Sequence, residues 1–555
     1  MIRLSTFFIV GSILVIWDQA AASAASFLPQ NFVSWLWQSS IVVDKWLYVD
    51  GGEIWARWDN ASANPSGVWN YQTLAIDLSQ DWNISTLSSP HVVATNKSTA
   101  ISPTRRPDLF FSPYDDTTYA LGGFMYSWEG GGSNNSVPVQ LWGFHPENNT
   151  GSVAWELQEV GPTAAFPLNE LMAGTLTASS GNAHYALGGQ TNEDGTGRDD
   201  FLIYNYGNGS WMNQTLPGKF YTWGGGHFIP AFGEQGVVIF FGGLWPSNSA
   251  GSGDASTAAG FDTVLVYDVQ TNTFFNPQQT TSSTGSAVLN RYDFCSVGAG
   301  NGSGNSSYEI FVFGGTTGST PTSDTATALA KVYILTLPAF HWIEAPAAAP
   351  IWRADHTCSV IGNRQMISIG GYQDPMTLQD QPTDVWANGM GIFDMTDLTW
   401  TEAYDSSAAA YQPSTLVTQY YSGSGRYPAS WVDPKLADIF EKSTSSSTAT
   451  PSTSHTSTPN PKKSNAGVIA GGTVGGVAVL AFIIGLVVWY TRRKRNFRSH
   501  ELGAYQPPPE VGSRGKEASE LDVGNTTSEL SGAERQRHEL DVETRRKTMP
   551  VELGT

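Results

Sequence analysis

Six apolar segments of the chain each end in a pair of glycines, and this recurrence constrains the fold more than any other feature. The segments read WLYVDGG, TYALGG, HYALGG, VVIFFGG, IFVFGG and MISIGG. The pairs are Gly51 and Gly52, Gly122 and Gly123, Gly188 and Gly189, Gly242 and Gly243, Gly314 and Gly315, and Gly370 and Gly371. Their first glycines lie 71, 66, 54, 72 and 56 residues apart. This spacing indicates one structural unit, repeated six times, with loops of variable length.

Each unit predicts four antiparallel strands. An earlier strand precedes the glycine pair, and two aromatic-containing strands follow it, as in VLVYDVQTNTFF, where Tyr267 is paired with Phe274. The expected partners elsewhere are Trp69 and Trp82, Trp142 and Trp155, Tyr204 and Trp211, Tyr333 and Trp342, and Phe393 and Trp400. Glycine lets neighbouring chains approach closely. Because no unit can bury both of its faces alone, we expect the six to stack radially into a ring.

The glycine pair with spaced Tyr and Trp resembles the kelch motif. Over about residues 27–440 the chain resembles fungal membrane-anchored kelch-repeat proteins, and six pairs in phase make the resemblance specific. The resemblance implies an all-β fold, a six-bladed kelch-type β-propeller. The long loops, and Phe274 in place of Trp in the fourth unit, leave a seventh blade possible.

Two terminal segments predict a membrane anchor. Residues 1–24 combine Arg3, an apolar run and Ala22-Ser23-Ala24, which is typical of a secretory signal peptide. Residues 466–490 are uncharged, and a cluster of basic residues from Arg492 to Arg498 follows them. This pattern predicts a transmembrane helix of type I topology in the plasma membrane or another secretory-pathway membrane. The GxxxG steps at Gly467, Gly471 and Gly475 allow a homodimer through the span, although a monomeric Gly-rich span fits as well.

The remaining regions are expected to be unfolded or glycosylated. Residues 441–465 form a Ser/Thr/Pro-rich linker, and residues 491–555 a disordered cytosolic tail. Nine sequons before the span are candidate N-glycosylation sites: Asn60, Asn83, Asn96, Asn134, Asn148, Asn208, Asn213, Asn301 and Asn305. The residues before Thr491 carry a net charge of −21, which argues against a nucleic-acid partner.

The two cysteines occupy matching positions of units five and six. The surrounding sequences are RYDFCSV at Cys295 and RADHTCSV at Cys358, so both residues are expected on the first strands of adjacent blades. A disulfide between Cys295 and Cys358 is one prediction, and two buried free thiols are the alternative.

No catalytic motif accompanies the repeat, so we expect no enzyme and no cofactor. The histidines before the linker are scattered, without the spacing of metal ligands, and His356 is the one nearest a cysteine. The kelch resemblance extends to galactose oxidase-type propellers, whose copper site needs Tyr and His ligands and a Cys–Tyr cross-link. A copper enzyme displayed on the membrane is therefore the rival interpretation.

The loops after the glycine pairs offer a candidate binding face. They lie on one side of a four-stranded meander and carry aromatic and acidic residues together. The candidates are Trp55, Trp58, Tyr126, Trp128, Glu193, Asp194, Trp245, Tyr372, Asp374 and Trp386. The alternative is that these aromatics only pack the loops down. With the topology, the face predicts a propeller that binds an extracellular protein or a cell-wall glycan.

Overall fold

The structure is a computed structural model. It describes residues 27–29, 31–59, 63–125, 140–147, 149–158, 173–190, 197–216, 220–244, 260–285, 288–301, 307–373 and 382–441. All of them belong to the first of two compact units, Met1–Ala449 and Thr450–Thr555. The expected signal peptide, the span at 466–490 and the tail lie outside the described residues, as does the linker except for Glu441. Within the described ranges, no helix has the length and apolar character needed to cross a bilayer.

Six antiparallel sheets, each with a core of four strands in chain order, dominate the first unit, as the all-β prediction requires. We number them sheets 1 to 6 in chain order. Sheet 1 contains β2 (Ser39–Val43), β3 (Trp46–Asp50), β6 (Gln72–Asp77) and β8 (Val92–Asn96); sheet 2 contains β10 (Asp108–Ser112), β11 (Thr117–Leu121), β13 (Leu141–Pro146) and β14 (Val153–Leu157). Sheet 3 contains β15 (Leu176–Ser179), β16 (Ala183–Leu187), β17 (Asp200–Asn205) and β18 (Ser210–Thr215).

The last three sheets follow the same order with small additions. Sheet 4 contains β19 (Gly225–Ile229), β20 (Val237–Phe241), β21 (Thr263–Asp268) and β22 (Thr273–Phe274), and β23 (Gln278–Gln279) also pairs with β21. Sheet 5 contains β25 (Tyr292–Gly300), β26 (Tyr308–Thr316), β27 (Lys331–Leu337) and β28 (His341–Ala348), and β24 (Thr281–Ser282) pairs with β28 in parallel. Sheet 6 contains β29 (Thr357–Ile361), β30 (Gln365–Ile369), β31 (Met390–Asp394) and β32 (Thr399–Thr401).

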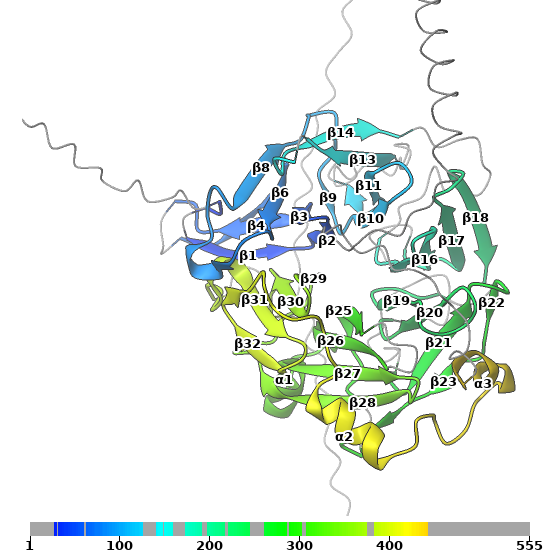
Figure 1. The fold of residues 1–555 in the computed structure, drawn as a ribbon. Coiled ribbons are helices and arrows are strands. Elements are labelled where there is room, and N and C mark those ends of the chain that lie inside the picture. The colour runs from blue at the N-terminus through cyan, green and yellow to red at the C-terminus, as the bar shows by residue number, and fades with distance from the viewer. Residues whose placement is uncertain are drawn as a thin grey trace, which may run out of the picture. The chain divides into compact units, whose positions relative to one another are not determined.

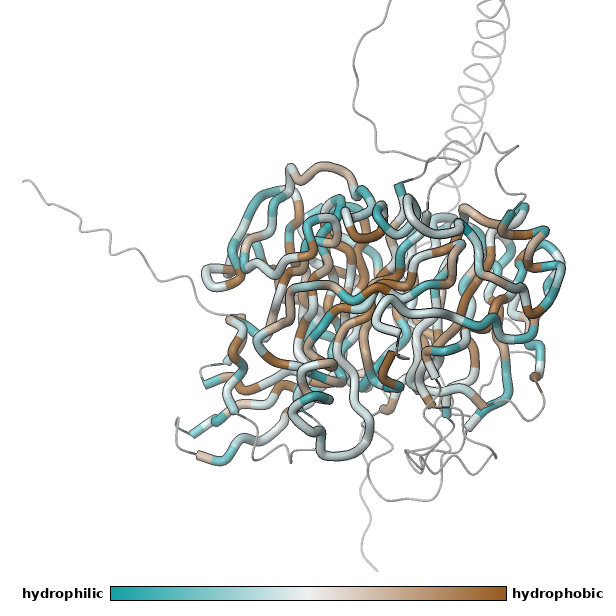
Figure 2. Tube along the Cα trace, turned by 90° about the horizontal axis from the view of Figure 1, so that it is seen from below, coloured by the Kyte–Doolittle hydropathy of each residue, from teal (hydrophilic) through white to brown (hydrophobic). Residues whose placement is uncertain are grey.

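The six sheets stand around a common centre (Figure 1). Their first strands, β2, β10, β15, β19, β25 and β29, each contact the next in this order, and β29 contacts β2. One buried apolar cluster lies between each pair of neighbouring sheets, including sheet 6 and sheet 1. Hydrophobic stretches accordingly concentrate in the interior (Figure 2).

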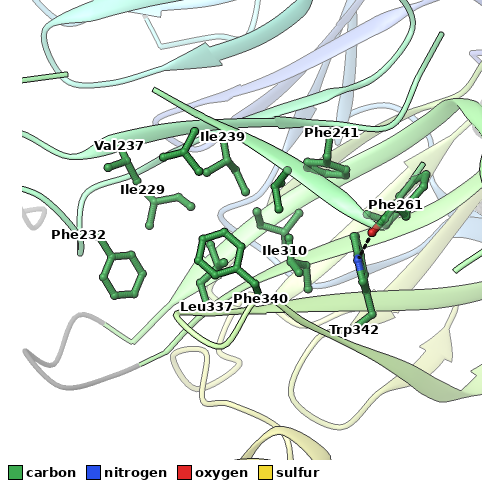
Figure 3. Packing of buried hydrophobic residues seen from close by; sticks show 14 of the residues in the cluster. Ile229, Phe232, Val237, Ile239, Phe241, Phe261, Ile310, Leu337, Phe340 and Trp342 are labelled. Carbon is green, nitrogen blue, oxygen red and sulfur yellow. Dashed lines mark hydrogen bonds between the residues drawn. The ribbon is translucent and has the colours of Figure 1, made fainter. Parts of the chain in front are cut away.

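The cluster between sheets 4 and 5 shows why no sheet is stable alone. Ile239 and Phe241 of β20 pack with Ile310 of β26 and Trp342 of β28, and all four side chains are essentially inaccessible (Figure 3). The indole of Trp342 donates a hydrogen bond of 2.8 Å to the backbone oxygen of Phe261. Separating the two sheets would expose these side chains, each of which contributes about 1.5–3 kcal/mol by its burial.

The glycine pairs join each sheet to the next through the backbone. Both glycines of every pair have φ between 62° and 92°, where a Cβ atom is strained. In five of the six pairs the second glycine donates its N–H to a carbonyl just before the first strand of the following sheet: Gly52 to Thr104, Gly189 to Tyr221, Gly243 to Arg291, Gly315 to Arg353 and Gly371 to Trp35, at 2.7–3.1 Å. A Cβ on Gly51, Gly188, Gly314 or Gly370 would meet the carbonyl oxygen that accepts from the second glycine of the same pair.

Short strands outside the six sheets form further pairs, one of which joins the unit of sheet 1 to the unit of sheet 6. β1 (Phe32–Leu36) pairs with β4 (Glu53–Ala56), which pairs with β5 (Ser66–Trp69), and β7 (Trp82–Asn83) of the first unit pairs with β33 (Ala403–Tyr404) of the last. β9 (Thr104–Arg105) pairs with β12 (Phe124–Met125). Between sheets 1 and 6, the hydroxyl of Ser40 lies 3.0 Å from that of Thr357 and 2.8 Å from that of Ser359.

The expected aromatic partners are correct in three units. Tyr204 lies opposite Trp211, Tyr267 opposite Phe274, and Phe393 opposite Trp400. In sheet 2, Phe144 rather than Trp142 faces Trp155. In sheet 5, Tyr333 faces Glu344 and Trp342 faces Leu335, because the hairpin pairs residues seven positions apart at this point and Tyr333 is nine residues from Trp342. In the first unit Trp69 faces Glu53 and Trp82 faces Tyr404. The two tryptophans lie in β5 and β7, short strands outside sheet 1 that pair with β4 and β33 and not with each other.

The chain after sheet 6 returns across sheets 5 and 4. It forms α2 (Thr415–Gly423) and α3 (Pro434–Glu441), while α1 (Ser323–Leu329) is an insertion in sheet 5 and η1 (Ile84–Thr86) and η5 (Ala387–Gly389) are single turns. The buried carboxylate of Glu309 anchors this return segment: it accepts hydrogen bonds from Tyr411 at 2.8 Å and Thr336 at 2.9 Å, and Thr336 also contacts Tyr421 at 3.0 Å.

We expect the Glu309→Gln substitution to change how stability depends on pH. Burial raises the pKa of Glu309, against the hydrogen bonds that it accepts. The folded chain therefore keeps a proton that the unfolded chain releases near pH 4.3, so the stabilisation is present below this pH and is lost as pH rises through the raised pKa. Denaturant titrations should show the native chain favoured over the variant most at about pH 4 and progressively less towards pH 8.

The control is Glu402→Gln at an exposed carboxylate, which should leave the pH profile unchanged. A difference between native and Glu309→Gln chains that does not vary with pH would contradict the assigned role of burial at this carboxyl group.

Candidate binding site at the axial mouth

Six residues at equivalent positions of the six sheets share an unusual backbone conformation. They are Trp37, Arg106, Gly174, Trp223, Asp293 and Asp355, with φ of 59°, 55°, 65°, 59°, 55° and 60°. Five of them stand two residues before the first strand of their sheet, and Asp293 is the second residue of β25. We call them the axial residues, because the first strands that they introduce surround the common centre.

Backbone hydrogen bonds connect all six axial residues. The N–H of Arg106 donates to the oxygen of Trp37 at 2.5 Å, and that of Trp37 to Asp355 at 3.2 Å. The series continues from Asp355 to Asp293 and from Asp293 to Trp223, both at 3.1 Å, and from Trp223 to Gly174 at 2.8 Å. Each sheet thus fixes the entry of its neighbour, and the bond from Trp37 to Asp355 joins the first sheet to the last.

Five of these six positions carry a side chain that a left-handed backbone disfavours. Glycine would adopt φ near +60° without strain, whereas other residues pay about 1–3 kcal/mol each. Strained non-glycine residues cluster at functional sites, where their side chains have to be held in place. The axial residues are therefore the candidate functional site of the described chain.

The side chain of Arg106 lies at the centre of the site. Its guanidinium donates to the carboxylate of Asp293 at 2.6 Å and forms an ion pair with Asp355, and it stacks 4.0 Å from the ring centre of Trp223. The three charged side chains are 19%, 12% and 5% exposed. Because they are largely removed from water, each charge depends on the others for its stability.

A second arginine, Arg105, packs against the axial residue Trp37. Arg105 bonds the carboxylate of Glu53 through Nε at 2.9 Å, and its guanidinium lies between the rings of Trp37 and Trp69, at 4.6 and 4.4 Å. The indole of Trp55 donates to the other oxygen of Glu53 at 3.1 Å. This network connects the end of the ring that carries the axial residues, which we call the axial mouth, to the β4–β5 hairpin.

A polar cavity of about 260 Å³ continues from the axial residues along the first strands. Hydroxyl groups of Ser39, Ser40, Thr175, Thr177 and Thr357 come from three different sheets to line it, together with Asp108. Asp108 accepts from His184 at 2.7 Å. A second cavity of about 390 Å³ lies among Trp37, Arg105, Arg106, Phe124, Trp223 and Asp293. The mouth can therefore hold a peptide side chain or a sugar by hydrogen bonds and charge.

The residues of the predicted binding face differ in solvent exposure, and six of them lie outside the described residues. Trp58 is exposed, at 45%, and Trp55 and Tyr372 are half-buried. Trp386 is 8% exposed, because it packs on Trp400 and beneath the guanidinium of Arg353 at 4.0 Å, so it holds its loop down and does not present a binding surface. Tyr126, Trp128, Glu193, Asp194, Trp245 and Asp374 lie outside the described residues.

The sequence analysis missed the axial residues, although two of them carry a visible signal. Arg291-Tyr-Asp293 and Arg353-Ala-Asp355 share the spacing Arg-x-Asp, and both arginines donate to the carbonyl of the first glycine of their own sheet. The same position holds Trp35 in sheet 1, whose indole donates to Gly51 at 3.0 Å. Alignment on the residue two before each first strand would have found five of the set, but not Asp293, which lies inside β25.

A disulfide joins Cys295 of β25 to Cys358 of β29, as one of the two predictions required. The Cα atoms are 5.5 Å apart and the bond links residues 63 positions apart across sheets 5 and 6. A cross-link of this span restricts the unfolded chain.

We expect the double substitution Cys295→Ala/Cys358→Ala to lower the free energy of unfolding by about 2–4 kcal/mol. Denaturant unfolding of the native and doubly substituted chains measures the difference. Reduction of the native chain should reproduce the loss, and equal stability of oxidised and reduced chains would contradict the cross-link.

Two of the described histidines are hydrogen-bonded to hydroxyl groups and are not grouped with other histidines. His184 bonds Ser179 at 2.9 Å, and His227 bonds Ser296 at 2.9 Å. Burial lowers the pKa of His227 to about 4 and that of His356 well below its ordinary value. In the described chain, only Cys295, His356 and Cys358 bring three His, Cys, Asp or Glu ligand atoms close enough to share an ion.

Five candidate glycosylation sites fall within the described chain. Asn96, Asn208 and Asn213 are exposed, and Asn83 and Asn301 are half-buried. The side chain of Asn83 caps η1 by accepting from Ser85 at 2.9 Å. Asn60, Asn134, Asn148 and Asn305 lie outside the described residues, so glycosylation at all nine stays a prediction.

Comparison with known proteins agrees with the sheet architecture. The chain is 27% identical over 327 residues to a kelch repeat-containing protein of Arthroderma benhamiae. The match covers 53% of this chain and 45% of that protein, so the chain matches less than half of its relative's length. No protein-family model matches the chain.

Proposed function

Since the chain is a homologue of a kelch repeat-containing protein, we propose that its six sheets are the blades of one six-bladed propeller and that this propeller binds a protein partner at its axial mouth. The observation that carries the proposal is the set of axial residues, of which five are non-glycine residues held at positive φ. A mouth that served only to close the ring would be less strained with glycine at every position.

The axial mouth opens on the same side as the loops that follow the glycine pairs. A first strand begins where the second strand of its sheet ends, so the axial residues and the glycine pairs share one face. The exposed Trp58 belongs to this face, and Tyr114, 60% exposed in the β10–β11 turn, belongs to the opposite one. Aromatic and arginine side chains are enriched at energetically dominant protein contacts.

We further propose that the propeller is displayed on the extracytosolic side of a membrane. The signal-like residues 1–24, the apolar residues 466–490 and the basic cluster after them support this placement. The acidic exterior would favour a partner with basic groups. The GxxxG steps support a homodimer through the span. A cell-wall glycan is the alternative ligand, which the following experiment distinguishes.

The experiment places a photo-activated phenylalanine derivative at Trp37 or at Tyr114 of the full chain in detergent. Irradiation with membrane and secreted proteins of the producing cells should give protein adducts from position 37 and none from position 114. An oligosaccharide array probed with the same chain tests the glycan alternative. The Trp37→Gly variant, which removes the ring and relieves the backbone, should bind the partner identified by the adducts, or the array ligand, at least about tenfold more weakly. Adducts from position 114 alone, or binding that Trp37→Gly leaves intact, would contradict the proposal.

A further inference from the structure

The disulfide between sheets 5 and 6 has an unexplained neighbour, the imidazole of His356. The sulfur atoms of Cys295 and Cys358 and a ring nitrogen of His356 all lie within 4.8 Å of one another. His356 stands two residues before Cys358, directly after the axial residue Asp355, and Phe313 of β26 packs edge-on against its ring at 5.3 Å.

His356 is buried with few groups to satisfy its two ring nitrogens. The residue is 7% exposed, and no described side chain hydrogen-bonds either ring nitrogen, so the backbone of Phe313 alone interacts with these nitrogens. The other described histidines for which contacts are given above bond a hydroxyl or a carboxylate. Buried polar groups are nearly always hydrogen-bonded, so an exception calls for an explanation such as an absent ion.

We propose that Cys295, Cys358 and His356 form a metal site for a borderline-soft divalent ion such as Zn²⁺ when the disulfide is reduced. Two thiolates and one imidazole are ligands that Zn²⁺ prefers, and three protein ligands leave a fourth position for water. His356 and Thr357 line the polar cavity of about 260 Å³, from which that water can come. This inference is independent of the proposed partner binding.

The exchange is balanced and needs a two-electron reductant. A dithiol transfers two electrons and two protons to the disulfide, becomes a disulfide itself and leaves two cysteine thiols. A phosphine does the same with one water molecule, which supplies the two protons and the oxygen of the phosphine oxide. Zn²⁺ then displaces the two protons and binds both thiolates. Cys358 is partly exposed, so a reductant can approach one of the two sulfurs. The ion replaces one link between β25 and β29 by another, which keeps the two sheets joined.

The experiment uses Co²⁺ as a spectroscopic substitute for Zn²⁺. The full chain is reduced with a phosphine, freed of it without oxygen, and titrated with Co²⁺, in parallel with the oxidised chain. The reduced chain should bind one equivalent with a thiolate-to-cobalt charge-transfer band, which Zn²⁺ abolishes, and the oxidised chain should give no band. Zn²⁺ should also raise the melting temperature of the reduced chain.

Two variants identify the ligands. His356→Ala should weaken binding by about tenfold or more, and Cys358→Ser should abolish the band, whereas His145→Ala in sheet 2 should change neither. Circular dichroism before titration checks that each reduced chain is folded. A reduced chain that binds no Co²⁺, or binds it equally well with His356→Ala, as unfolded cysteines would, overturns the proposal. The comparison of oxidised with reduced native chain needs no substitution and decides the case if a variant does not fold.

Discussion

Substitution of Gly370 by alanine should lower the free energy of unfolding by about 3 kcal/mol or more. Gly370 has φ of 68°, and its added Cβ would collide with the backbone oxygen of Trp35. This is the place where sheet 6 meets the start of the chain, and the next residue, Gly371, donates to the same oxygen at 2.7 Å. Neither backbone can move without opening the ring, so we expect a large loss in denaturant unfolding.

The matched control is Gly181→Ala. An added Cβ at Gly181 has no neighbouring atom within 4 Å, and its φ is not in the left-handed range, so we expect a change of no more than about 0.5 kcal/mol. A Gly370→Ala chain as stable as the control would contradict the close contact between Gly370 of sheet 6 and the backbone of Trp35.

Removal of the Arg106 side chain should have a comparable effect for an electrostatic reason. The Arg106→Ala change leaves the carboxylates of Asp293 and Asp355 together, largely buried and without their cation. Loss of one partner from such a pair costs about 3–5 kcal/mol. Unfolding of native and variant chains by denaturant measures this loss.

Neutralising the two carboxylates distinguishes this explanation from lost packing. In the Arg106→Ala background, Asp293→Asn together with Asp355→Asn should recover part of the stability, because no unpaired charge is then buried. If the triple variant is no more stable than Arg106→Ala, the contact of Arg106 with Trp223, rather than its charge, holds the mouth together.

The repeat made the architecture predictable, because the glycine pairs reflect a requirement of the backbone. Each pair lies so close to the neighbouring chain that an added Cβ would collide with it. Glycine is therefore needed at the same point of the units and is visible in the sequence. The partner of each aromatic was less predictable. In β27–β28 the position opposite Trp342 is held by Leu335, seven residues earlier as in the hairpins of sheets 3, 4 and 6, so the expectation of an aromatic partner pointed wrongly to Tyr333.

The axial site was harder to predict, because its members share a backbone conformation and not a residue type. Trp37, Arg106 and Asp293 have different side chains, and residue type does not reveal that all three have a positive φ. The exposure of the loop aromatics was similarly undetermined. Trp58 and Trp386 occupy comparable loops, but Arg353 and Trp400 cover only the second.

Residue-resolved hydrogen exchange of the Trp37 amide tests most directly whether the sheets close into one ring with a fixed mouth. This amide lies before a first strand, in a segment that would exchange rapidly if the first and last sheets were separate. Its hydrogen bond of 3.2 Å to Asp355 predicts protection comparable to that of the central strand β3, since both would be lost only when the ring opens. Exchange of Trp37 at the rate of an exposed loop amide, while β3 stays protected, would contradict the closed ring.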